Sequence, residues 1–154
     1  MRQAPTAGMT ANKRSDRGSA TVEFALFSML LLVPITYVLI TVFTVQRAAY
    51  ATTEGAREAA RAFVTAPTGG QARIRMNAAL ALALADQGLD MTSATVSVRC
   101  SADPCLTPGA TVTVTVSDRV ALPWVPVVLG RPSASILVSA EHVQTVDLFR
   151  AARP

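Results

Sequence analysis

The feature that most constrains this chain is a run of 23 residues without a formal charge, from Phe24 to Gln46. A helix of this length spans roughly 35 Å, enough to cross a hydrocarbon core of about 30 Å. The run is apolar on every side, whereas a helix on the surface of a soluble domain keeps one polar face. We therefore predict that it is a transmembrane helix.

The composition agrees with one membrane segment beside one domain. Of the 154 residues, 51% are hydrophobic and 16% are charged, a balance unusual for a soluble domain. The formal net charge is +4, but residues 1–18 hold four basic residues and one acidic residue, so most of the excess is local. Nucleic-acid binding needs a basic surface on the folded part. We therefore expect no nucleic-acid partner.

The charges beside the apolar run predict its orientation. Lys13, Arg14 and Arg17 precede the run, and only Arg47 follows it closely. The positive-inside rule then places the amino terminus in the cytoplasm and the rest outside. A secretory signal peptide is the alternative, with Ala49-Tyr50-Ala51 as a small-x-small site, but its apolar region has only about 7–15 residues. We expect a single-pass protein of the cytoplasmic membrane.

The junction between the basic tail and the apolar run reads RGSATVEFAL, from Arg17 to Leu26. An acidic side chain costs about 2.5–3.5 kcal/mol at the bilayer centre and less toward the edge, so Glu23 is a candidate functional residue. Gly18, small residues, Glu23 and an apolar helix resemble the processing site of type IV-like prepilins. With Pro34, the junction resembles the TadE-like pseudopilins of tight-adherence (Tad/Flp) pilus systems. The resemblance covers roughly residues 14–63.

That resemblance implies a function and partners. A prepilin peptidase would cut between Gly18 and Ser19, leaving Ser19–Pro154, and Glu23 would meet the terminal amine of an adjacent subunit. Two charges that are costly singly in lipid become tolerable when paired. The implied protein is a minor pilin or pseudopilin involved in pilus assembly or adhesion. After assembly, it would leave the membrane for a pilus on the cell surface. Its implied partners are the prepilin peptidase, sibling pilins or pseudopilins, the assembly platform in the membrane, and lipid.

The alternative function is a permanently anchored single-pass protein with Gly18 uncut. Its outer domain would bind a surface ligand or an assembly partner. No catalytic or phosphate-binding motif occurs in the sequence. For either function we expect no enzyme activity, no metal and no cofactor.

Two features of the long helix leave alternatives open. Pro34 removes a backbone hydrogen bond, and either programs a bend or is an ordinary proline of a membrane helix. Beyond the membrane the helix is predicted to continue to Val64. A stripe of small residues there allows close helix approach, either to the chain's own sheet or to neighbouring subunits: Ala49, Ala56, Ala60 and Phe63.

The fold class expected for the outer part is α+β. Pro67-Thr68-Gly69-Gly70 ends the first helix, and Gln71 to Gln87 predicts a second that Gly88 stops. We expect one apolar face of that second helix to lie in the core, and assign to it Ile74, Ala78, Ala81, Leu82 and Ala85, with Leu80 and Leu84 widening it. We predict a cleaved basic leader at 1–18, a transmembrane helix with its extension at 19–64, and an extracytoplasmic domain at 65–154.

Alternating residues predict three antiparallel strands packed on the first helix. They lie around Val96–Cys100, Thr111–Ser117 and Ser135–Val146, the last with a bulge near Glu141 and His142. Between the second and third strands, Val120–Pro132 holds prolines that disfavour a central strand. With Trp124, this segment covers the core, touches the bilayer surface or meets a partner.

The two cysteines, Cys100 and Cys105, enclose four residues. In an oxidising compartment outside the membrane, we expect a structural disulfide. Redox chemistry or metal binding is the alternative, although two thiols with only His142 elsewhere in the chain make a poor metal site.

Overall fold

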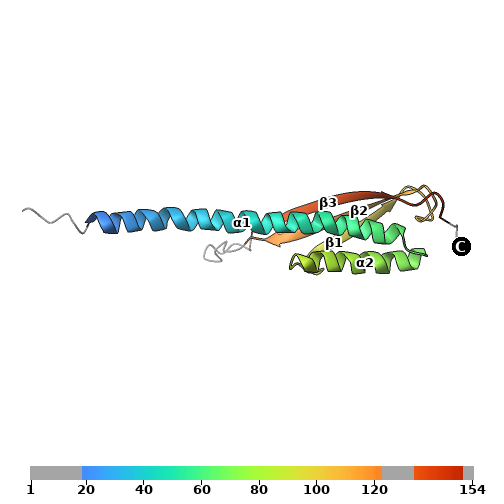
Figure 1. Ribbon diagram of the computed structural model, residues 1–154, viewed down its shortest axis with the longest axis horizontal. Helices are drawn as coiled ribbons and strands as arrows, with labels where there is room; N and C mark the ends of the chain where they lie inside the picture. The colour runs from blue at the N-terminus through green and yellow to red at the C-terminus, as the bar shows by residue number, and fades with distance from the viewer. Residues whose placement is uncertain (1–18, 123–133, 151–154) are drawn as a thin grey trace, which may run out of the picture. The chain divides into compact units, whose positions relative to one another are not determined.

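The computed structural model describes residues 19–122 and 134–150. In chain order these form α1 (Ser19–Val64), α2 (Gly69–Asp86), β1 (Ala94–Cys100), β2 (Thr111–Ala121) and β3 (Ser135–Thr145), as Figure 1 shows. The α+β class and the predicted second helix and three-stranded antiparallel sheet are confirmed. The chain divides into two units, one ending at Val38 and the other beginning at Leu39.

In the first unit, α1 carries large apolar side chains that are exposed. Phe24 is 74% exposed and Leu30 is 71% exposed. None of the most apolar stretch of the helix is buried. By length and composition, this helix is able to cross a membrane.

In the second unit, the three strands form an antiparallel sheet in the order β1-β2-β3. The β2–β3 register is unbroken from Thr111↔Thr145 to Ala121↔Ser135. The predicted bulge near Glu141 and His142 is therefore wrong, because every residue of β3 has one partner on β2.

Strand β2 is also longer than the sequence predicted. Val120 and Ala121, which we assigned to the irregular segment, belong to this strand. Their pairing with β3 continues the register set by the valines before them, and the Leu122 amide donates to the Ala134 carbonyl at 2.9 Å. The rest of the predicted segment, 123–133 with Trp124, lies outside the described residues.

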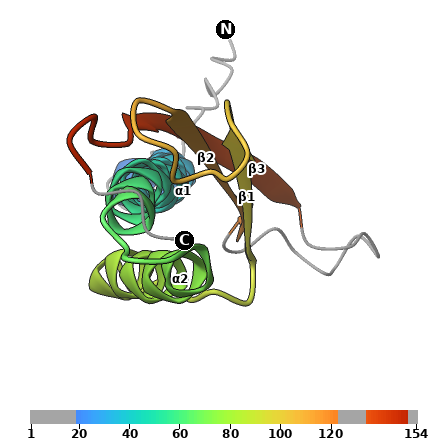
Figure 2. The ribbon, with the colours of Figure 1, turned by 90° about the vertical axis from the view of Figure 1, so that its right-hand side faces the viewer.

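The core lies between one face of the sheet and two helices. Figure 2 shows the domain part of α1 and α2 side by side on that face. Along β2 the buried and half-buried residues alternate, and the buried ones join α1 residues in the core cluster. Of the predicted small-residue stripe, Ala56, Ala60 and Phe63 are buried in this cluster, while Ala49 is half-buried. This part of the stripe packs on the chain's own sheet.

Helix α2 buries only one part of the apolar side that we predicted. Its buried residues are Ala72, Met76, Leu80 and Leu84, so the expected burial of Leu80 and Leu84 is confirmed. Ile74 is 71% exposed and Leu82 is 66% exposed, so their assignment to the core is wrong. The helix is apolar on two sides, and periodicity does not say which one meets the sheet.

The ends of α2 follow known capping chemistry. Its Thr68 N-cap accepts a hydrogen bond from the Gln71 amide, so Gly69 and Gly70 form its first turn instead of preceding it. At the other end Gly88 has φ +66°, and its amide donates to the Ala85 carbonyl at 2.8 Å. The predicted stop at Gly88 is confirmed, because glycine adopts this left-handed conformation without strain.

Candidate functional site

The predicted processing site lies at the start of α1. Ser19 is the first residue of the helix, and Gly18 lies outside the described residues. Glu23 begins the second turn and is exposed. It lines a shallow, open hollow of the helix surface together with Val22, Leu26, Phe27 and Leu30.

The surroundings of Glu23 are apolar. No hydrogen bond or ion pair joins its carboxylate to another of the residues 19–122 and 134–150. A carboxylate in such a setting is stabilised by any cation that approaches it, more strongly in a low dielectric than in water. The arrangement can therefore bind a positively charged group presented by another molecule.

Pro34 lies inside α1, and the helix continues through it. Proline has no N–H, so the Leu30 carbonyl one turn earlier lacks its usual helical donor. The two interpretations of Pro34, a programmed bend and an ordinary proline, both stay predictions.

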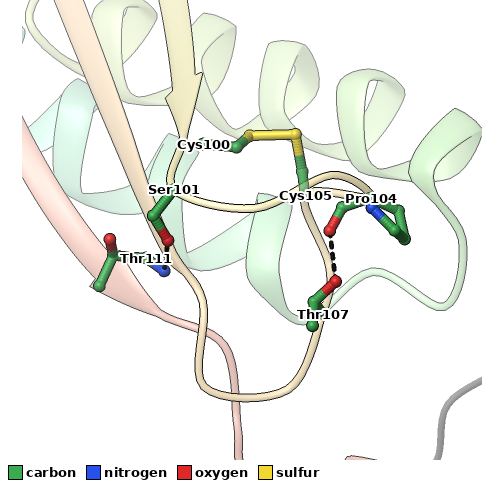
Figure 3. The surroundings of a disulfide bond; sticks show 6 residues. All are labelled: Cys100, Ser101, Pro104, Cys105, Thr107 and Thr111. Atoms are coloured by element: carbon green, nitrogen blue, oxygen red, sulfur yellow. Dashed lines mark hydrogen bonds between the residues drawn. A yellow bond between two sulfur atoms is a disulfide. The ribbon is translucent and has the colours of Figure 1, made fainter.

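The two cysteines join the end of β1 to the following loop. Their sulfur atoms are 2.11 Å apart and their Cα atoms 5.2 Å apart, and Figure 3 shows the bond. The loop is further held by hydrogen bonds. The Thr111 amide donates to Ser101 Oγ at 2.8 Å, and Thr107 Oγ1 donates to the Pro104 carbonyl at 2.7 Å.

This loop borders a cavity of about 540 Å³ at the far end of α1. The disulfide, Phe63 and Arg73 line it, together with Arg150. Arg150 donates from Nη1 to the Val64 carbonyl at 2.6 Å and from Nη2 to the Ala66 carbonyl. Its guanidinium thus caps the carboxyl end of α1, where carbonyls lack partners and a positive charge is favoured.

No local sequence pattern indicates this cap. Arg150 lies 86 residues after Val64, and only the fold brings the two together. The cavity is lined by apolar and polar residues together, including Leu106, Asp103 and the two arginines, and the contacts described here are structural.

Within the described ranges, no group of three or more His, Cys, Asp or Glu side chains is placed to hold a metal ion. His142 is half-buried on β3 opposite Val114. The predicted site residues fall at two places, Ser19 and Glu23 in the first unit and the disulfide in the second.

Comparisons of the chain with protein-family models, with curated proteins and with solved structures find no match.

Proposed function

We propose that this protein is a TadE-like minor pilin or pseudopilin of a tight-adherence pilus system, anchored in the cytoplasmic membrane by α1 with its domain outside. The observation that carries the proposal is the position of Glu23, an unpaired carboxylate one turn into an exposed apolar helix that begins at Ser19. Cleavage after Gly18 would place a new terminal amine within one turn of this acid.

The distribution of apolar surface supports membrane anchoring. The part of α1 up to Val38 exposes phenylalanine, leucine and isoleucine side chains on all sides. Burying each of them in lipid is worth about 1.5–3 kcal/mol. A prepilin helix first spans the bilayer and later packs against sister helices, so one apolar surface serves both states.

The pairing role of Glu23 follows from electrostatics. The terminal ammonium of an adjacent subunit would neutralise the carboxylate, and a charge pair in lipid is less costly than two separate charges. This protein would be the substrate of a peptidase and a structural subunit, without catalysis of its own.

The deciding experiment is the mass of the protein isolated from membranes of a host that has the prepilin peptidase. Loss of residues 1–18 is expected, and Gly18→Val should abolish that loss because the resemblance to prepilins implies cutting after a glycine. An intact amino terminus in the unaltered protein favours the alternative, a permanently anchored single-pass protein. Normal cutting of Gly18→Val rules out this processing site.

Glu23→Ala tests the pairing role separately. We expect normal cleavage but loss of incorporation into filaments, measured as the fraction of protein sheared from cells. Glu141→Ala is the matched control, since it removes an exposed glutamate carboxylate of the domain, on β3. Equal incorporation of the two variants would remove Glu23 from the assembly mechanism.

A further inference from the structure

The outer face of α2 is apolar, and its side chains are exposed apart from the half-buried Ala81. We define this face by Ile74, Ala78, Ala81, Leu82 and Ala85, which lie on one side of the helix. Ile74 and Leu82 are 71% and 66% exposed. Figure 2 shows the opposite side of α2 turned toward α1 and the sheet. The helix therefore buries one apolar face and leaves a second one open.

Two charged residues flank this outer face. Arg75 and Asp86 are eleven residues apart, about three helical turns, so they lie on the same flank at opposite ends of the face. Asp86 shares a groove of about 310 Å³ with Glu54 and Glu58 of α1, and Leu82 lies at the same groove. One end of the flank is thus basic and the other is acidic.

We propose that the outer face of α2 docks on the same face of a second copy of this chain, with the two helices antiparallel. A two-fold axis midway between Arg75 and Asp86 places each arginine opposite the acidic groove of the other copy. A parallel arrangement would instead leave the two basic ends at one level on opposite flanks. Charge complementarity therefore selects both the partner and the direction.

The sizes of the apolar residues agree with this register. With the axis midway between Leu80 and Ala81, Leu82 of one copy lies within about 1.5 Å, along the helix, of the level of Ala78 of the other. Ile74 lies within about 3 Å of the level of Ala85. Each large side chain then lies close to a small one, the arrangement that lets helices approach closely.

One helix face is smaller than the roughly 800 Å² per partner of a typical stable interface. We therefore expect the dimer on a membrane, where shared anchoring raises the effective concentration. In this respect the inference rests on the proposed membrane anchoring, but it does not depend on cleavage after Gly18 or on Glu23.

The test is disulfide crosslinking of the full chain in phosphatidylcholine vesicles. Both native cysteines are bonded to each other, so a single added cysteine reports on the face. Ala81→Cys lies near the two-fold axis and should give a covalent dimer on mild oxidation. Gln71→Cys lies on the same side of α2, about 15 Å further along it, and antiparallel copies would hold these thiols roughly 30 Å apart.

Rapid dimer formation by Ala81→Cys but not Gln71→Cys supports the antiparallel pair. No dimer from Ala81→Cys, or equal crosslinking at both positions, overturns it. Unchanged amide exchange of β2 in each variant shows that the domain is folded.

Charge reversal then tests the flank. In the Ala81→Cys background, Arg75→Glu or Asp86→Arg alone should slow crosslinking about two- to fivefold, the range of a surface charge pair. The double reversal restores opposite charges and should recover part of the rate. If the double variant is slower than both single variants, the Arg75–Asp86 pairing is refuted. Because the full chain with residues 1–18 is used throughout, failure here is separate from failure of the processing hypothesis.

Discussion

The two parts of α1 satisfy their apolar side chains in opposite ways. Up to Val38 the helix exposes large residues such as Leu30, and no part of the chain described by the structure covers them. From Ala48 onward it buries small residues, including Ala56 and Ala60, against the sheet and α2. Hydrophobic content alone therefore does not predict burial within the chain. Small residues let a neighbouring element come close, whereas large residues on all sides call for lipid or other molecules.

The largest expected effect contrasts two leucines. Leu80→Ala opens a cavity in the core of the domain and should lower its free energy of unfolding by about 2–5 kcal/mol. Leu30→Ala removes the same atoms from the exposed part of α1 and should change it by less than about 0.5 kcal/mol. Amide exchange of β2 in the full chain in detergent micelles measures both. Similar losses would mean that the exposed part of α1 contributes as much to the stability of the domain as its core does.

The disulfide belongs to the domain alone. Replacing Cys100 and Cys105 together by serine should lower the free energy of unfolding of the domain by about 2 kcal/mol, on the chain-entropy model for a short loop. The amides of α1 before Val38 should exchange as before. Ser97→Ala, at an exposed position of the same strand, is the control and should have little effect. A loss that spreads to the first unit would contradict the division.

Gly55 tests how closely α1 and α2 pack. A Cβ at this position would lie 2.7 Å from Leu80 Cδ1. We expect Gly55→Ala to destabilise the domain by about 1 kcal/mol, because the overlap outweighs the better helix propensity of alanine. In a Leu80→Ala background the overlap is gone, so the same substitution should stabilise by up to about 1 kcal/mol. If Gly55→Ala has the same effect in both backgrounds, the contact between position 55 and Leu80 does not determine how closely α1 and α2 pack.

The smallest effect concerns an exposed acid that has partners in its own chain, in contrast to Glu23. Asp90 Oδ1 accepts two hydrogen bonds from Thr92. One comes from the Thr92 hydroxyl and the other from the Thr92 backbone amide, at 2.8 Å. These bonds hold the pKa of Asp90 below its ordinary value. Because the pKa is lower in the folded state, the bonds stabilise the fold above the ordinary pKa, and this stability is lost as the pH falls through the lowered one.

Thr92→Val removes the hydroxyl donor and should raise the pKa of Asp90 toward its ordinary value. A carboxyl-carbon NMR titration measures this shift. The unaltered protein under the same conditions provides the reference. An unchanged pKa would mean that the Thr92 hydroxyl does not hold the carboxylate in solution.

Much of the fold could be predicted because its signals are local. The apolar run, the alternating valines of β2 and the stop at Gly88 each depend on residues within a few positions of one another. Pairing of Cys100 with Cys105 was also predictable, since the cysteines are close in sequence and the inferred compartment is oxidising. Gly18 and Glu23 came from a local motif, and their roles stay predictions.

The sequence by itself determined the order of the helices and strands, though not all of their ends, and that one helix is apolar enough for a membrane. Only the tertiary structure decided which face of α2 meets the core, because Met76, Leu80 and Leu84 compete with Ile74 and Leu82 for the same role. The tertiary structure also brought Arg150 to the end of α1 and Leu80 against Gly55. Such choices depend on the fit between surfaces distant in sequence, and no local pattern of residue types records that fit.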